Sequence, residues 1–110
     1  MKEENTNVQM RKGVLEFCIL SIVNEKDAYT SDLIERLKSA HLIVVEGTLY
    51  PLLTRLKNQG YLSYYWEESK AGPPRKYFKI TENGIQFLNE LRENWLDFVN
   101  SVNSIIQIKN

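Results

Sequence analysis

The chain has 110 residues, a length that suits a single domain with a modest core. Its 14 basic and 14 acidic residues cancel, so the overall charge gives no argument for a nucleic-acid partner. No apolar run has the pattern of a signal peptide or the length of a membrane span. The single cysteine, Cys18, excludes an intrachain disulfide, so we expect a protein of the reducing cytoplasm with no membrane partner.

Two helices are expected in the first 40 residues. Residues 8–24 are apolar on nearly all sides, as in a helix that is covered from several directions. Thr30 and Ser31 are candidate N-caps for a second helix over residues 32–39. The β-branched segment 41–45 is typical of a very short strand, which would pair with a later hairpin.

Residues 46–60 have the pattern of a helix with one apolar and one polar face. Four leucines at helical spacing make the apolar stripe: Leu49, Leu52, Leu53 and Leu56. Pro51 is expected in the first turn, where its missing N–H removes no helical hydrogen bond, and Gly60 is expected to end the helix. Such a helix can lie in the major groove of DNA. The candidate DNA contacts on it are Thr48, Tyr50, Pro51, Arg55 and Lys57.

Two strand-like runs follow, at residues 62–66 and 75–80, and a Gly/Pro-rich stretch joins them into a hairpin. This hairpin resembles the wing of a winged helix, and Trp66 is expected to anchor it to the body of the domain. The cations around its turn are further candidate DNA contacts: Lys70, Arg75 and Lys76.

These candidates also have simpler interpretations. Tyr50 could pack against the hairpin, Arg55 could pair with Glu46 or another acid, and the hairpin cations could form an ordinary solvated face. The distribution of charge favours DNA binding, because residues 46–81 hold six Lys or Arg against three Glu and are therefore the basic part of the chain.

The last expected helix begins after Thr81, a candidate N-cap, and carries a heptad stripe. Six side chains recur at alternating spacings of three and four: Leu88, Leu91, Trp95, Phe98, Val102 and Ile105. Such a stripe predicts a two-fold dimer in which this helix packs on its partner. Trp95 either fills the dimer core or lines a gap in it.

The elements together predict a mainly α chain with a small β-hairpin. Residues 1–81 would form a winged helix-turn-helix DNA-binding domain, and residues 82–110 a dimerisation helix, in one compact unit. The inventory predicts no enzyme, no cofactor and no metal site, because catalytic and phosphate-loop motifs are missing and the single histidine, His41, has no partner at metal-ligand spacing.

Two blocks of sequence are specific when taken together. The first is Gly47-Thr48-Leu49-Tyr50-Pro51-Leu52-Leu53-x-Arg55-Leu56-x-x-x-Gly60-x-Leu62, and the second is Gly72-x-Pro74-Arg75-Lys76-Tyr77-Phe78-x-Ile80-Thr81-x-x-Gly84. With the flanking helices, they resemble the PadR family of bacterial transcriptional regulators over nearly the whole chain. The chain departs from many relatives at Pro73, where they carry a further basic residue, which removes one expected contact of the wing with phosphate.

The resemblance implies a homodimeric repressor that answers to small aromatic or hydrophobic effectors. Some small members are similar in having an aromatic residue at the subunit interface on which planar ligands stack, which makes Trp95 a candidate effector contact. The implied mechanism is occupancy of a pseudo-palindromic operator in double-stranded DNA, relieved by the effector. The alternative is a winged helix used as a protein-interaction module without DNA binding.

Overall fold

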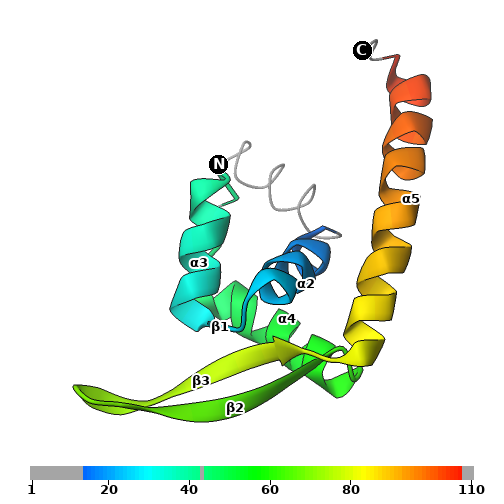
Figure 1. Cartoon of the computed structure of the whole chain (residues 1–110). Coiled ribbons are helices and arrows are strands. Elements are labelled where there is room, and N and C mark those ends of the chain that lie inside the picture. Colours follow the sequence, from blue (N-terminus) through cyan, green and yellow to red (C-terminus); the bar gives the residue numbers. More distant parts are fainter. Residues whose placement is uncertain (1–13, 43, 108–110) are drawn as a thin grey trace.

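The computed structural model describes residues 14–42 and 44–107 (Figure 1). Their elements, in chain order, are α2 (Leu15–Glu25), β1 (Ala28–Tyr29), α3 (Thr30–Ser39), α4 (Glu46–Asn58), β2 (Leu62–Ser69), β3 (Gly72–Ile80) and α5 (Glu82–Ile106). The fold is a winged helix-turn-helix with a long C-terminal helix, as the sequence predicts. Residues 8–13 of the first expected helix lie outside the described residues. None of the helices within the described ranges is long and apolar enough to cross a membrane.

The core lies between the first three of these helices, the base of the hairpin and the first turns of α5. The leucine stripe of α4 points into it, as predicted, and α3 and β3 contribute further apolar side chains. The fully covered or nearly covered members from these elements are Leu33, Leu37, Leu49, Leu53, Leu56 and Phe78. Burying each such side chain contributes about 1.5–3 kcal/mol, so this stripe holds α4 against the body and leaves its opposite face to solvent.

The sheet is antiparallel with strand order β1-β3-β2. Side chains alternate along the strands, so the hairpin has two different faces. We call the face that carries Leu62, Tyr64 and Phe78 the inner face, because Leu62 and Phe78 belong to the core. The outer face carries Tyr65 and Tyr77, which are paired across the strands.

The hairpin is longer than the sequence predicts, because β3 begins at Gly72 and includes both prolines. Its turn consists of Lys70 and Ala71, between the paired residues Ser69 and Gly72. The register shifts beside Glu67, where the two prolines of β3 lie opposite one residue of β2. Proline is tolerated at such a bulge, since the ladder there needs no N–H donor. The Gly/Pro-rich stretch that was expected to form the turn is therefore largely a strand end with a bulge.

The short strand is β1, and the prediction of a strand at 41–45 is wrong. Of that segment, residues 41, 42, 44 and 45 are not in a strand, Val44 is buried in the core, and Val45 is the N-cap of α4. Instead Ala28 and Tyr29, which are extended between α2 and α3, pair with Phe78 and Tyr77. β-branched composition alone did not distinguish a buried connection from a paired strand.

Two predictions about helix starts are also wrong. Helix α3 begins at Thr30, so Thr30 and Ser31 lie in its first turn, and the N-cap is Tyr29, whose backbone N–H donates to Asp32 Oδ2 over 3.2 Å. Helix α4 begins at Glu46, which places Pro51 inside the helix instead of in its first turn. Because proline has no N–H, the carbonyl of Gly47 has no helical donor four residues later.

The ends of α4 and α5 are tied together by hydrogen bonds, and both predicted caps are confirmed. Gly60 has a φ of 84°, and the N–H groups of Gly60 and Tyr61 donate to the carbonyls of Lys57 and Leu56, which ends α4 in a Schellman motif. The Thr81 hydroxyl accepts from the Gly84 N–H at 2.9 Å and donates to the Gly60 carbonyl at 2.6 Å. The start of α5 is thereby fixed relative to α4, and α5 then extends away from the body (Figure 1).

Candidate nucleic-acid interface

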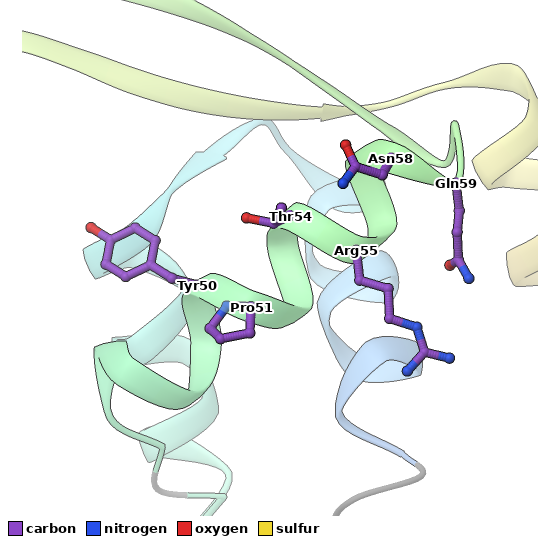
Figure 2. Close-up of a pocket in the computed structure, with 6 residues that line it drawn as sticks. All are labelled: Tyr50, Pro51, Thr54, Arg55, Asn58 and Gln59. Carbon is purple, nitrogen blue, oxygen red and sulfur yellow. The ribbon is translucent and has the colours of Figure 1, made fainter.

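The solvent face of α4 presents a row of hydrogen-bonding side chains. Tyr50, Thr54 and Asn58 are spaced four residues apart, all three are exposed, and they point to the same side of the helix (Figure 2). They line a shallow, open hollow together with Pro51, Arg55 and Gln59. A phenol, a hydroxyl and an amide in one row can donate hydrogen bonds to base edges and accept them. A side-chain amide can also make a bidentate pair of hydrogen bonds with adenine.

Sequence reasoning selected Tyr50 from this row and missed Thr54 and Asn58. The signal was present, because the row is the complement of the leucine stripe at the same helical spacing. Thr54 and Asn58 are uncharged and lie beyond the leading end of the helix, so neither cationic character nor position marks them in the sequence. The structure therefore extends the candidate face from the start of α4 to its last residue.

Arg55 points away from this row, toward α2 (Figure 2). Its Nη1 lies 3.4 Å from Oε1 of Glu16, whose side chain is largely covered. The expected alternative, that Arg55 pairs with an acid, holds in this structure with Glu16 as the partner. Thr48 is exposed and lies seven residues before Arg55, hence on the same flank of the helix. Because the Arg55 side chain is itself exposed, the pair contributes on the order of 1 kcal/mol, so a phosphate can compete for the guanidinium.

The other flank of α4 faces the inner face of the hairpin. Lys57 Nζ lies 5.5 Å from the centre of the Tyr64 ring, and Lys76 Nζ lies 4.0 Å from the same ring. Lys76 Nζ also lies 6.0 Å from the centre of the Trp66 ring. Trp66 is 62% exposed, so the prediction that it anchors the hairpin to the body is wrong.

Arg75 lies on the outer face, opposite to Lys76, since consecutive strand residues alternate. Its guanidinium carbon lies 4.9 Å from the centre of the Tyr29 ring. Tyr29 in turn contacts Tyr77 edge-on at 5.4 Å, and Tyr77 stacks on Tyr65 at 5.7 Å. The wing cations thus do not form one surface: Arg75 and Lys76 occupy different faces, and the exposed Lys70 is in the turn.

Tyr65 makes the stability of the fold depend on pH in the alkaline range. The hydrogen bond from its hydroxyl to Asp27 Oδ2, 2.8 Å long, is the main cause that raises the pKa of Tyr65 from 10 to about 12. The folded chain holds this proton where the unfolded chain has lost it, so the stabilisation is complete below pH 10 and disappears as the pH rises toward 12. The unfolding temperatures of wild type and Tyr65→Phe should therefore converge over that range. A difference between them that stays constant with pH would contradict the hydrogen bond from Tyr65 to Asp27.

The apolar stripe of α5 begins in the core of the chain and ends on its surface. Leu88 is fully buried in its own chain and Leu91 is partly buried, so a partner chain cannot use Leu88. The Trp95 ring packs 5.8 Å from Phe17 of α2 and stays 38% exposed. The exposed apolar side chains that follow are Leu96, Phe98, Val102, Ile105 and Ile106. Heptad spacing alone could not show at which residue of α5 the stripe stops packing against its own chain.

Metal and thiol chemistry find no support in the described part of the chain. No group of three potential metal ligands occurs among residues 14–42 and 44–107. Cys18 is half-buried, and burial raises the pKa of its thiol, which makes the reactive thiolate scarcer.

Known proteins resemble the chain in sequence and in structure. The model of the "Transcriptional regulator PadR-like family" matches residues 19–90. An uncharacterized protein of Lysinibacillus sphaericus is 29% identical over 89 residues, which cover 78% of this chain and 82% of that protein. The structure of a PadR-like transcription factor from Bacteroides fragilis is 57% identical, with a TM-score of 0.77, and the match covers 92% of this chain and 98% of that one. The structure of a PadR family regulator from Eggerthella lenta is 28% identical, with a TM-score of 0.86 and coverages of 96% and 93%. The chain therefore belongs to the PadR-like family of transcriptional regulators.

Proposed function

We propose that this regulator is a homodimeric repressor that binds a pseudo-palindromic operator in double-stranded DNA. The observation that carries the proposal is the exposed row of Tyr50, Thr54 and Asn58 on a helix whose other face is buried in the core. Placed in a major groove, this row would meet base edges while cations on either side meet phosphates. The proposal includes no catalytic role, and it places the protein in the cytoplasm with the DNA.

The proposed DNA contacts fall into two groups. Base edges would be contacted by the row on α4, with Pro51 beside it. Phosphates would be contacted by the remaining predicted residues: Thr48, Arg55, Lys57, Lys70, Arg75 and Lys76. Arg55 would first leave Glu16, and Arg75 would act from the outer face of the wing.

The proposed dimer forms through α5. Its exposed stripe from Trp95 to Ile105 is apolar and continues the stripe that is buried nearer the body. A second copy of the same helix would cover it by two-fold packing. The two recognition helices would then read half-sites about one DNA turn apart.

DNA binding is tested with a duplex that the wild-type protein enriches from a random-sequence library. Fluorescence anisotropy should show affinity that falls steeply as salt is raised. Asn58→Ala should weaken binding to the enriched duplex about ten-fold, because one base contact contributes about 1–3 kcal/mol. Asn100→Ala, the same change at an exposed position of α5, should bind like wild type.

The alternative, a module for protein interaction, predicts a different result. The double variant Arg75→Ala with Lys76→Ala should lose most DNA affinity and reduce the salt dependence while remaining dimeric. If that variant binds duplex as tightly as wild type, the wing does not contact DNA. If wild type enriches no duplex at all, the DNA-binding proposal fails and the alternative gains support.

We also propose that a planar hydrophobic effector binds beside Trp95. The support is an indole that packs on Phe17 and is still partly open, next to the exposed Phe98. An effector that binds one dimer geometry better than another would shift the population away from the geometry that fits the operator. Dimer core remains the competing role for Trp95.

Tryptophan fluorescence separates these two roles. Titration of the wild type with a panel of planar aromatic compounds should give saturable quenching that persists in Trp66→Phe and is lost in Trp95→Phe. Quenching that Trp95→Phe retains would place the ligand elsewhere. Absence of quenching by every compound would favour the role of Trp95 in the dimer core.

A further inference from the structure

Two lysines and two aromatic rings gather where the last turn of α4 meets the inner face of the hairpin. We call this the helix–wing surface, and its members are Lys57, Tyr64, Trp66 and Lys76. Both ammonium groups lie near the Tyr64 ring, Lys57 Nζ at 5.5 Å and Lys76 Nζ at 4.0 Å from its centre. The two cations come from different elements, so Tyr64 connects the recognition helix to the wing.

Trp66 is the member without a structural explanation. It shares the inner face with Leu62 and Tyr64, but Leu62 is buried, Tyr64 is 40% exposed and Trp66 is 62% exposed. Exposure thus increases along the strand toward the turn, and most of the indole is open to solvent. A large apolar ring held open beside a cation is typical of a contact surface and contributes little to the core.

The charges next to Trp66 select the kind of partner. Lys76 is its cross-strand neighbour, and Lys57 Nζ lies 5.5 Å from the centre of the Tyr64 ring, which precedes Trp66 on the inner face. Of the two acids that follow Trp66, Glu67 lies on the outer face opposite Arg75, and the exposed Glu68 lies at the bulge, closer to the turn. A basic surface with open aromatic rings is complementary to a sugar–phosphate backbone, where the rings meet deoxyribose and the ammonium groups meet phosphates.

We infer that the helix–wing surface binds the sugar–phosphate backbone next to the groove that α4 enters, with Trp66 packed on the sugars and Lys57 and Lys76 on the flanking phosphates. This inference rests on the proposed DNA-binding function and adds Trp66 and Tyr64 to its contacts. The surface is continuous with the exposed row of α4 through Lys57, which belongs to the same helix as Asn58. One duplex can therefore contact both.

The test uses Trp66 as its own reporter. The chain has two tryptophans, so the wild type is compared with Trp66→Phe, which keeps Trp95 alone. Addition of the duplex enriched by the wild type should change the emission of the wild type saturably and protect part of it from acrylamide. Trp66→Phe, measured at a concentration that saturates the same duplex, should show neither effect.

Affinity measurements provide a second readout that a merely structural role would not reproduce. Trp66→Ala should bind the duplex about ten-fold more weakly with an unchanged salt dependence, because an apolar ring is no longer covered, and Trp66→Phe should recover most of the affinity. Lys76→Ala should lower the slope of log affinity against log salt by about one per subunit. Lys79→Ala is the matched control, because Lys79 is an exposed lysine of the same strand on the outer face.

The outcomes separate this inference from the function on which it rests. If the wild type and Asn58→Ala behave as proposed but Trp66→Ala binds like wild type and Trp66 emission does not respond, only the helix–wing surface is refuted. If the wild type binds no duplex, the DNA-binding function fails and this inference fails with it. A tenfold loss in Trp66→Ala accompanied by a lower melting temperature and no emission change also overturns it.

Discussion

Gly84→Ala is expected to destabilise the domain by about 3 kcal/mol, the upper range for forcing extra volume into a packed site. A Cβ at this position would lie 2.7 Å from Cγ1 of Ile80 and well inside contact distance of the Tyr61 carbonyl oxygen. That oxygen belongs to the backbone and accepts the N–H of Thr81 at 3.1 Å, so it cannot rotate away. The added methyl group would separate the start of α5 from the end of α4.

Urea unfolding of wild type and Gly84→Ala at equal protein concentration measures this effect, since concentration shifts the apparent stability of an oligomer. The control is Gly47→Ala in α4, where nothing lies within 4 Å of an added Cβ. This control should be unchanged or more stable by up to about 1 kcal/mol, because alanine is the better helix former. Equal unfolding midpoints for wild type and Gly84→Ala would refute the close contact.

The double variant Phe98→Glu with Ile105→Glu is expected to convert the proposed dimer into folded monomers. Both side chains are exposed in the subunit, at 62% and 80%, so the substitutions spare the core while placing carboxylates on the proposed interface. Sedimentation should give half the wild-type mass, and affinity for the enriched duplex should fall by about 100-fold or more, since the second half-site is no longer linked to the first.

The matched control adds the same charges to the other side of α5, as Asn100→Glu with Ser104→Glu, and should stay dimeric. Leu88 and Leu91 are unsuitable for this test, because their burial within the subunit would mix unfolding with dissociation. A wild-type mass for the Phe98 and Ile105 variant would exclude the exposed stripe of α5 as the interface.

Elements that depend on local sequence were predictable. The leucine stripe predicted the buried face of α4, Gly60 predicted its end, and Thr81 predicted the start of α5, since each signal acts within one turn of helix. Strand β1 was not predictable, because its two residues are extended only through pairing with Tyr77 and Phe78, which lie about fifty positions later.

In the candidate site, too, features set by local sequence were predictable and features set by distant contacts were not. The presence of cations near the recognition helix and the wing could be read from the sequence, but their directions could not. Arg55 is turned toward Glu16 of α2, and Arg75 is turned toward Tyr29, both of which are distant in the sequence. Trp66 was expected to anchor the hairpin to the body, yet it lies on the inner face close to the turn, beyond the part of the hairpin that the core covers, and stays open.

The most direct test of the proposed function is the sequence that the wild-type protein enriches from a random library of duplex DNA. Two copies of the α4 row in a symmetric dimer predict a two-fold symmetric sequence whose half-sites are centred about 10 base pairs apart. Enrichment of such a sequence, lost in the monomeric variant, is the expected result. The absence of any enriched sequence, even at low salt where phosphate contacts are strongest, would contradict the DNA-binding function.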